Sequence, residues 1–440
     1  MNIKNWAGNV AFSPSAVERP NSVEAVQAIV KRAREQRQGI RVMGARHSFS
    51  QLIVTNDILI SLENMTGLIS VDKDTTQATV WAGTAIHQLG PLLAEHGIAF
   101  PNQGDVDAQS LAGATSTGTH GTGFEFAALA NHVIAMELVD GHGNVRRVDQ
   151  NSPGDVLNAA RVSLGTFGIL TKLTIQCVPT FVLRDQRRRV RLEDCLAGAI
   201  AEARGVRHLE FFWYPYSPWA QIKTCVPVSE LAPRDTLKKY IDDEILERYL
   251  FGSLCELTAM IPVMSRLTSK IAGVLMPDAS YSDIAYKVYP SSRHVRFNEM
   301  EYAVPLEQGI ACFLAIKSMI ERERIQVFFP IEFRVAKADL CWLSPMYGRE
   351  SAIISLHVFR FTDQRRYFEM AEAIFRAHGG RPHWGKVHNM DRAQAGAYYP
   401  KWKDFEVLRE EMDPDGIFLN PMLKKLFSTT PRRADSGAGA

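Results

Sequence analysis

The stretch Val42-Met-Gly-Ala-Arg-His-Ser-Phe-Ser50, directly after a short apolar run, decides the fold of this chain. A second glycine-rich stretch, Ala112–Gly123, has the sequence Ala-Gly-Ala-Thr-Ser-Thr-Gly-Thr-His-Gly-Thr-Gly. Both allow close backbone approach and offer successive N–H groups, as a diphosphate requires. Neither matches the dinucleotide fingerprint GxGxxG, and no strand leads straight into a helix at Gly118–Gly123. The residues alone therefore indicate either a dinucleotide site of another kind or a pair of tight turns.

The pattern predicts alternating helices and strands on both sides of these loops, from residue 20 to residue 175. The clearest helix signal is Pro20–Gln36, where Asn21 is the expected N-cap and Glu24 stands three residues later. Asp140-Gly-His-Gly143 predicts the turn of a hairpin. Further helices are expected at Ala85–His96 and Asp155–Arg161, and strands at Ile40–Met43, Ile58–Leu62, Ala78–Trp81, Val133–Val139, Val145–Val148 and Ile169–Val178.

The pattern changes after Pro179, which suggests a second domain inserted before a C-terminal segment that returns to the first. The expected divisions are 1–178, 179–397, 398–427 and a disordered tail at 428–440 that is rich in Ser, Thr, Pro, Gly and Ala. Within the second domain we expect aromatic-rich strands in 181–228, helices in 235–275, strands at Gln326–Val335 and Ala352–Phe359, and a helix at Gln364–His378.

Composition narrows the class of protein. The 440 residues suffice for two or three domains of ~100–200 residues. Lys and Arg number 50 against 48 acids, so no strong field attracts nucleic acid. The six cysteines stand singly without a CxxC pair, and Met1–Val10 lacks the apolar core of a signal peptide. We therefore expect a cytoplasmic protein in a reducing compartment.

Phe251–Met276 is the most apolar long stretch, but it contains Glu256, Arg266 and Lys270. These charges are too costly for a helix that crosses a bilayer. We expect one or two helices packed on the protein, with shallow contact at a membrane surface as the alternative.

Four ordered motifs in the first half of the chain resemble the vanillyl-alcohol oxidase flavoprotein family, and three in the second half agree. Within that family the resemblance is strongest to the aldonolactone oxidases and the bacterial alditol oxidases. It implies an α+β fold, with a two-subdomain FAD-binding domain of the PCMH type and a substrate (cap) domain whose antiparallel sheet is flanked by helices. The motifs are Ser22–Ile29, Gly44–Phe49, Gly113–Gly123 and Ser163–Leu170, followed by Gly380–Lys386, Tyr399–Trp402 and Asp413–Asn420.

The resemblance implies FAD as cofactor, tethered through a ring nitrogen of His47. A neutral imidazole is a competent nucleophile for such a bond, although a histidine that merely lines the loop is the alternative. No Cys precedes Cys177, so a second, cysteinyl link is not expected. The positions that match the cofactor-binding motifs are Gly44, Ala45, Arg46, His47, Ser48, Phe49, Gly113, Ser116, Thr117, Gly118, Thr119, His120, Gly123, Gly165, Gly168 and Ile169.

Candidate catalytic residues lie in the second half. Period two on a strand puts Glu332 and Arg334 on one face, which from the residues alone could be a surface ion pair. The resemblance places this pair beside the flavin, and it implies active-site positions for His357 and Lys386. Gly380–Lys386 has the spacing of a phosphate-binding P-loop, but Val387 replaces the Ser or Thr and a helix precedes it where a strand is needed.

No metal site is expected, because His383 and His388 have no third ligand near in sequence. The implied reaction passes a hydride from a carbinol carbon to the flavin, while His357 or Lys386 takes the hydroxyl proton. Arg334 and Lys386 would stabilise negative charge, Glu332 would bind substrate hydroxyls, and O2 or another acceptor would reoxidise the flavin. The motifs favour an aldonolactone substrate; a polyol, or flavin binding without turnover, are the alternatives.

Overall fold

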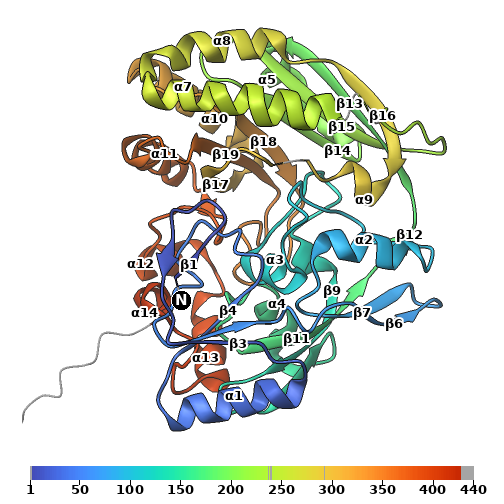
Figure 1. Cartoon of the computed structure of the whole chain (residues 1–440), viewed down its shortest axis with the longest axis vertical. Helices are drawn as coiled ribbons and strands as arrows, with labels where there is room; N and C mark the ends of the chain where they lie inside the picture. The colour runs from blue at the N-terminus through green and yellow to red at the C-terminus, as the bar shows by residue number, and fades with distance from the viewer. Residues whose placement is uncertain (1, 236, 238–239, 292, 428–440) are drawn as a thin grey trace, which may run out of the picture.

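The computed structural model describes residues 2–427 except 236, 238, 239 and 292. Figure 1 shows two lobes stacked along the long axis, with the blue and red ends of the chain together in the lower lobe. Helices and strands are mixed in both lobes, so the predicted α+β class is confirmed. The expected disordered tail, 428–440, lies outside the described residues. In the described part of the chain, no helix is both long and apolar enough to cross a membrane.

Two sheets build the first lobe: a parallel sheet of order β3-β5-β4 and an antiparallel sheet of order β10-β9-β11-β7-β6. Their strands are β3 (Ala16–Glu18), β4 (Ile40–Met43), β5 (Ile58–Ser61), β6 (Leu68–Asp72), β7 (Gln77–Trp81), β9 (Val133–Val139), β10 (Val145–Asp149) and β11 (Ile169–Gln176). The remaining elements are α1 (Val23–Glu35), α2 (Ile86–Ala94), α3 (Leu111–Thr117), α4 (Val156–Arg161), and the short strands β1 (Ile3–Lys4), β2 (Ala11–Phe12), β8 (Ile98–Ala99) and β12 (Val178–Pro179).

Helix α1 shows why the predicted elements formed and where one prediction was wrong. Its apolar residues fall on one face, and Val26 and Val30 are fully buried. The helix begins at Val23, so Asn21 is not the N-cap. Ser22 has an extended backbone, and its hydroxyl accepts a hydrogen bond from the Ala25 N–H at 3.1 Å.

An eight-stranded antiparallel sheet of order β16-β13-β15-β14-β18-β19-β17-β20 forms the second lobe. Its strands are β13 (Val182–Arg191), β14 (His208–Trp213), β15 (Trp219–Val228), β16 (Ala279–Ile284), β17 (Phe297–Pro305), β18 (Ile331–Ala336), β19 (Ser351–Phe359) and β20 (Arg381–Pro382). Its helices are α5 (Leu192–Gly205), α7 (Gly252–Met260), α8 (Ser265–Leu275), α9 (Ala285–Val288), α10 (Gly309–Arg322) and α11 (Arg365–Ala377), with a further helical segment at Ile241–Phe251.

The two faces of this sheet have different neighbours. On one face, Phe333 stacks on Phe211 with ring centroids 4.8 Å apart, in a core that α5, α10 and α11 complete. Glu332 and Arg334 therefore face the opposite side, as period two predicts. That side meets the first lobe, where the Gly123 N–H donates to the Val335 carbonyl at 2.8 Å. The polar face of the sheet thus closes over the glycine-rich loops.

The C-terminal segment packs on the first lobe. It begins before the expected residue 398 and contains α12 (Arg392–Tyr398), α13 (Trp402–Met412) and α14 (Pro421–Phe427). Phe405 stacks on Phe167 at 4.8 Å. The buried Arg41 guanidinium, next to the first loop, donates to the carbonyls of Leu164 and Phe418. The two ends of the chain therefore share one core.

Candidate active site

A cavity of about 370 Å³, here called the loop cavity, lies between the two glycine-rich loops. Ten of the sixteen predicted cofactor residues line it: Gly44, Ala45, Arg46, His47, Ser48, Gly113, Ser116, Thr117, Gly165 and Gly168. The other six, Phe49, Gly118, Thr119, His120, Gly123 and Ile169, do not line it.

The backbone of the first loop suits a diphosphate. A Cβ on Gly44 would meet the hydroxyl of Ser110, the N-cap of α3, at 2.2 Å, so a glycine here lets the first loop approach the start of α3 this closely. Arg46 adopts a left-handed conformation, with φ of 61°. Among the described residues, the backbone N–H groups of Arg46, His47 and Ser48 are paired with no protein acceptor. Three consecutive free donors beside a glycine fit an anionic group such as the diphosphate of FAD.

His47 lies where the loop cavity meets a second, smaller cavity of about 40 Å³, here called the inner cavity. Its ring stacks on Trp6 with centroids 5.4 Å apart. Burial, with the nearby charges of Lys386 and Arg46, lowers the pKa of His47 to about 4. The imidazole is therefore neutral at physiological pH and able to act as a nucleophile.

The inner cavity is bounded by residues from both lobes, including Trp6, Gln109, Arg293, Phe297, Glu299 and Lys386. The loop that carries Lys386 is held between the first loop and β17. The Phe49 N–H donates to the Gly385 carbonyl at 2.6 Å, and the Val387 N–H donates to the Glu299 carbonyl at 2.9 Å. These backbone bonds bring the Lys386 and His47 side chains to one small space.

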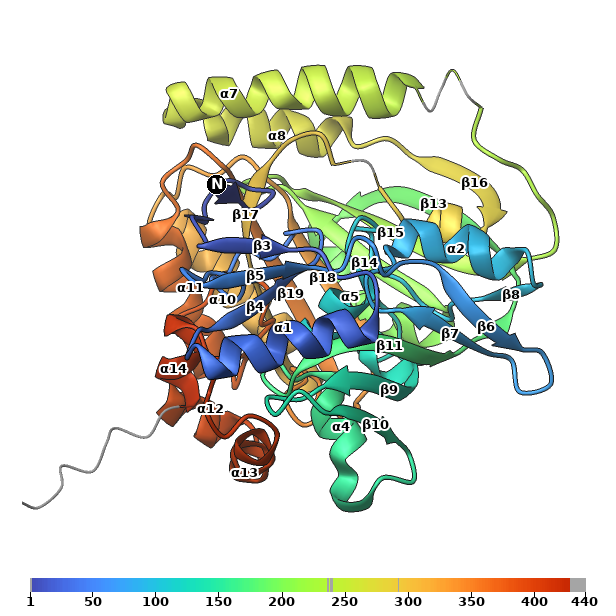
Figure 2. The ribbon, with the colours of Figure 1, turned by 60° about the horizontal axis from the view of Figure 1, so that its bottom comes forward.

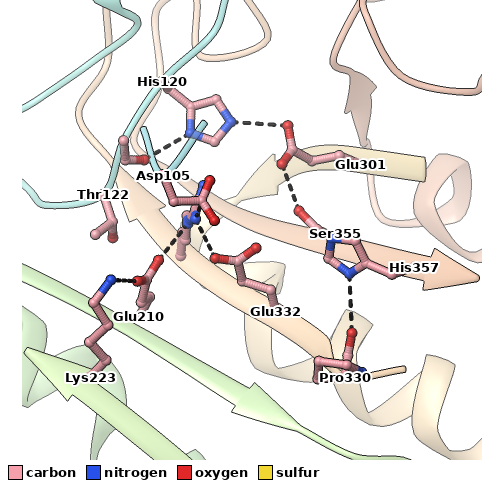
Figure 3. Close-up of polar contacts among 12 residues, drawn as sticks. Asp105, His120, Thr122, Glu210, Lys223, Glu301, Pro330, Glu332, Ser355 and His357 are labelled. Atoms are coloured by element: carbon pink, nitrogen blue, oxygen red, sulfur yellow. Dashed lines mark hydrogen bonds and ion pairs between the residues drawn. The ribbon is translucent and has the colours of Figure 1, made fainter. Parts of the chain in front are cut away.

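Glu299 connects two of the predicted catalytic residues. One of its carboxylate oxygens accepts from Lys386 Nζ at 2.5 Å, and the other lies 3.5 Å from His357 Nε2. Burial would raise the pKa of Glu299, but Lys386 and His357 lower it to about 2. The carboxylate is therefore ionised. Lys386 lines the inner cavity, whereas His357 does not. The Nδ1 atom of His357 lies 3.1 Å from the Pro330 carbonyl oxygen (Figure 3).

Glu332 and Arg334 lie on one face and form an ion pair, which is buried and not at the surface. Arg334 Nε also donates to Glu210 at 2.7 Å, and its terminal nitrogen lies 3.5 Å from Asp105 (Figure 3). Burial and the nearby Glu210 charge raise the pKa of Glu332 to about 8, although Arg334 opposes this. Neither residue of the pair lines the inner cavity; Arg293, which pairs with Asp105, does.

A second network lies beside the lysine loop. The Glu301 carboxylate accepts from Ser355 at 2.6 Å and contacts His120 Nε2 at 3.1 Å (Figure 3). His120, a predicted cofactor residue, is thus buried with its side chain turned toward β17. Within the described residues, no three His, Cys, Asp or Glu side chains gather as a metal site would require.

The sequence reasoning missed β17, which supplies Glu299 and Glu301, and it also missed α5 and α10. A signal was present in β17, because Glu299 and Glu301 alternate with Met300 and Tyr302 at the strand period. Alternating acids ordinarily indicate a solvent-facing strand, whereas here both carboxylates are buried.

Comparison with known proteins gives matches along almost the whole chain. Residues 173–426 match the family model described as D-arabinono-1,4-lactone oxidase, and residues 14–149 match an FAD binding domain. The chain is 34% identical over 424 residues to an L-gulono-1,4-lactone dehydrogenase of Mycobacterium tuberculosis, covering 96% of this chain and 98% of the relative. It is 28% identical over 431 residues to the L-gulonolactone oxidase of Bos taurus, with the same two coverages of 96% and 98%.

Solved structures agree on the fold. Cholesterol oxidase from B. sterolicum superposes with a TM-score of 0.82 at 18% identity, covering 97% of this chain and 96% of that one. A xylooligosaccharide oxidase from Myceliophthora thermophila superposes with a TM-score of 0.70 at 13% identity, covering 95% and 93%. The chain therefore shares its two-lobed fold with these two oxidases.

Proposed function

The chain belongs to the D-arabinono-1,4-lactone oxidase family of FAD-dependent oxidoreductases, and from this premise we propose how its residues oxidise an aldonolactone. It acts on a CH–OH group of the lactone. The observation that carries the assignment of residues is that His47 lines both cavities, while Lys386 and Glu299 line the inner cavity with it.

The loop cavity holds FAD. The backbone donors of Arg46–Ser48 face its diphosphate, and Gly44 and Gly113 leave room for it. When bound, FAD supplies the two-electron acceptor for the hydride of the substrate carbon. The proposed electron acceptor is O2 or another oxidant. A cytoplasmic location remains our prediction.

Lys386 receives the hydroxyl proton on its neutral amine, which thereby becomes the ammonium group that Glu299 binds. It is the predicted base that borders the inner cavity, and Glu299 holds its ammonium group at 2.5 Å, which keeps the side chain pointed at one place. Arg293 provides a positive charge on the same wall for substrate oxygens, while Trp6 and Phe297 exclude water. Loss of the hydride and the proton converts the carbinol next to the lactone carbonyl into a ketone, which tautomerises to an ascorbate-like enediol.

His47 is the proposed point of covalent attachment. Its neutral imidazole and its position between the cavities support a bond from a ring nitrogen to the flavin methyl carbon. His47 would hold the cofactor through its ring nitrogen, and the acceptor that reoxidises the enzyme would supply the two-electron oxidant that this bond requires. Acid precipitation tests the bond: yellow colour should stay with the washed pellet of the wild type and move to the supernatant for His47→Ala. Colour in the wild-type supernatant would exclude the tether.

Anaerobic flavin bleaching tests the substrate class. L-gulono-1,4-lactone or D-arabinono-1,4-lactone should reduce the bound flavin, whereas sorbitol and xylitol should leave it oxidised. Reduction by the polyols alone would assign the chain to alditol oxidation. A flavin that none of these compounds reduces would favour binding without turnover.

A further inference from the structure

Helix α8 buries its small and polar residues and exposes its large apolar residues. Ser265, Thr268, Ser269 and Gly273 form its buried side, whereas Leu267, Ile271, Val274 and Leu275 are 53%, 49%, 46% and 69% exposed. A helix at a water-facing surface ordinarily buries its large apolar side chains and exposes polar ones. The outward face of α8 is therefore suited to bind an apolar surface of another molecule.

The packing beneath the helix fixes this orientation. A Cβ on Gly273 would lie 2.0 Å from the Ser217 hydroxyl, so the helix approaches its neighbour at van der Waals distance on that side. Ser269 donates to the Val327 carbonyl at 3.3 Å, and the Arg266 guanidinium lies 5.1 Å from the Tyr216 ring centroid. Rotation of α8 to bury its leucines would break all three contacts.

The last residue of α7 and the turn before α8 extend the same apolar surface. Met260 and Val263 are 82% and 69% exposed. Figures 1 and 2 both place α7 and α8 at the top of the molecule, at the end of the second lobe away from the first. We name the exposed residues Met260, Val263, Leu267, Ile271, Val274 and Leu275 the α8 surface. It can meet a broad partner without obstructing the loop cavity in the other lobe.

We infer that the α8 surface docks the protein on an anionic lipid membrane. Residues 257–276 contain no Asp or Glu and two basic residues, Arg266 and Lys270. Lys270 is exposed among the aliphatic side chains, from which a lysine stem can lie along the acyl boundary while its ammonium group reaches a lipid phosphate. Aliphatic insertion combined with positive charge is complementary to a cytoplasmic leaflet.

The same residues fit a protein partner less well. Interface cores favour Tyr, Trp and Arg and are depleted in Lys, whereas the α8 surface is aliphatic around Lys270. Symmetric pairing of α8 with a second copy would bring the two Lys270 side chains together, and residues 257–276 supply no acid to neutralise them. A second copy is therefore the competing occupant that the test must separate.

Vesicle flotation of the FAD-loaded full chain tests the inference. Wild type should float with vesicles of equal phosphatidylcholine and phosphatidylglycerol, and only weakly with pure phosphatidylcholine. The double variant Leu267→Glu/Ile271→Glu should lose partitioning by more than ~10-fold, because two exposed aliphatic groups that insert into the lipid become charged. Lys270→Gln should weaken binding to the anionic vesicles alone.

The matched control is Val407→Glu/Phe361→Glu, which changes two residues that are 59% and 67% exposed elsewhere. It should float as wild type does, and every variant should oxidise lactone at the wild-type rate, which shows that each is folded. Equal binding of wild type and the α8 variant would overturn the inference, as would equal binding to neutral and anionic vesicles. The inference would also be overturned if the wild type were a dimer that does not bind vesicles and the α8 variant were a monomer. The α8 surface would then bind a second copy of the chain.

Discussion

Lys386 and His357 are equivalent candidates in the sequence, but they differ in position. Both contact Glu299, yet Lys386 alone of the two borders the inner cavity. Lys386→Ala should leave the flavin bound and slow its reduction by lactone by ~10²–10⁴-fold, the usual contribution of a general base. His357→Ala should cause a much smaller loss in the same stopped-flow measurement. A larger loss for His357→Ala would reverse the assignment.

Glu299 acts on the substrate through Lys386. Glu299→Gln keeps the shape of the side chain and removes the charge that holds the ammonium group, so kcat should fall more than KM rises. The reduction rate at saturating lactone, set against the lactone concentration that gives half of that rate, measures this split. Glu301→Gln is the control, since that carboxylate contacts His120 and Ser355 instead. Equal losses of kcat in the two variants would contradict the role of Glu299.

Helix α1 offers a test of a single cap at the scale of an element. Ser22→Ala removes the acceptor of the Ala25 N–H and should lower the free energy of unfolding by about 1 kcal/mol. Asn21→Ala should cost less, because Asn21 precedes the cap. The urea concentrations at half-unfolding compare the two variants directly, provided that the slope of the unfolding free energy against urea concentration is unchanged. The reverse order of the two effects would support the cap predicted from the sequence.

Elements of the first lobe could be predicted because their signals are local. Apolar residues at helical or strand spacing and glycine turns located the hairpin of β9 and β10 within a residue. The site could be predicted only in part. Burial of Glu299 and Glu301 depends on β19 and β20 pairing with the two edges of β17, and those partners are distant in sequence. Arg293 stands outside any regular element, so periodicity gave no reason to select it.

At the scale of the whole molecule, histidine burial sets how stability depends on pH. Burial lowers the pKa of His47, His132 and His388 to about 4, and that of His208 and His383 to about 3. Below about pH 6.5 the unfolded chain therefore binds protons that the folded chain does not. Stability is fully present above that pH and falls as the pH drops toward 4.

Thermal unfolding at pH 7.5, 6.0 and 5.0 should accordingly give a falling Tm. Each such histidine contributes a slope of about 1.4 kcal/mol per pH unit. His132→Leu should flatten the dependence by about one histidine's share, because His132 lies between the Phe100 and Phe126 rings, where leucine can pack. A pH slope unchanged in this variant would show that His132 titrates normally in the folded chain.

The core shared by the two ends of the chain also dictates when the protein can acquire its cofactor. Arg41 and Phe418, which meet beside the loop cavity, are 377 residues apart. Ribosomes deliver about 5–20 residues per second, so roughly 20 to 75 seconds separate the synthesis of the first from that of the second. During that interval the nascent chain has the glycine loops but lacks the residues that close their core. Flavin capture thus waits until residue 418 has been synthesised, and the second lobe is made before the first is complete.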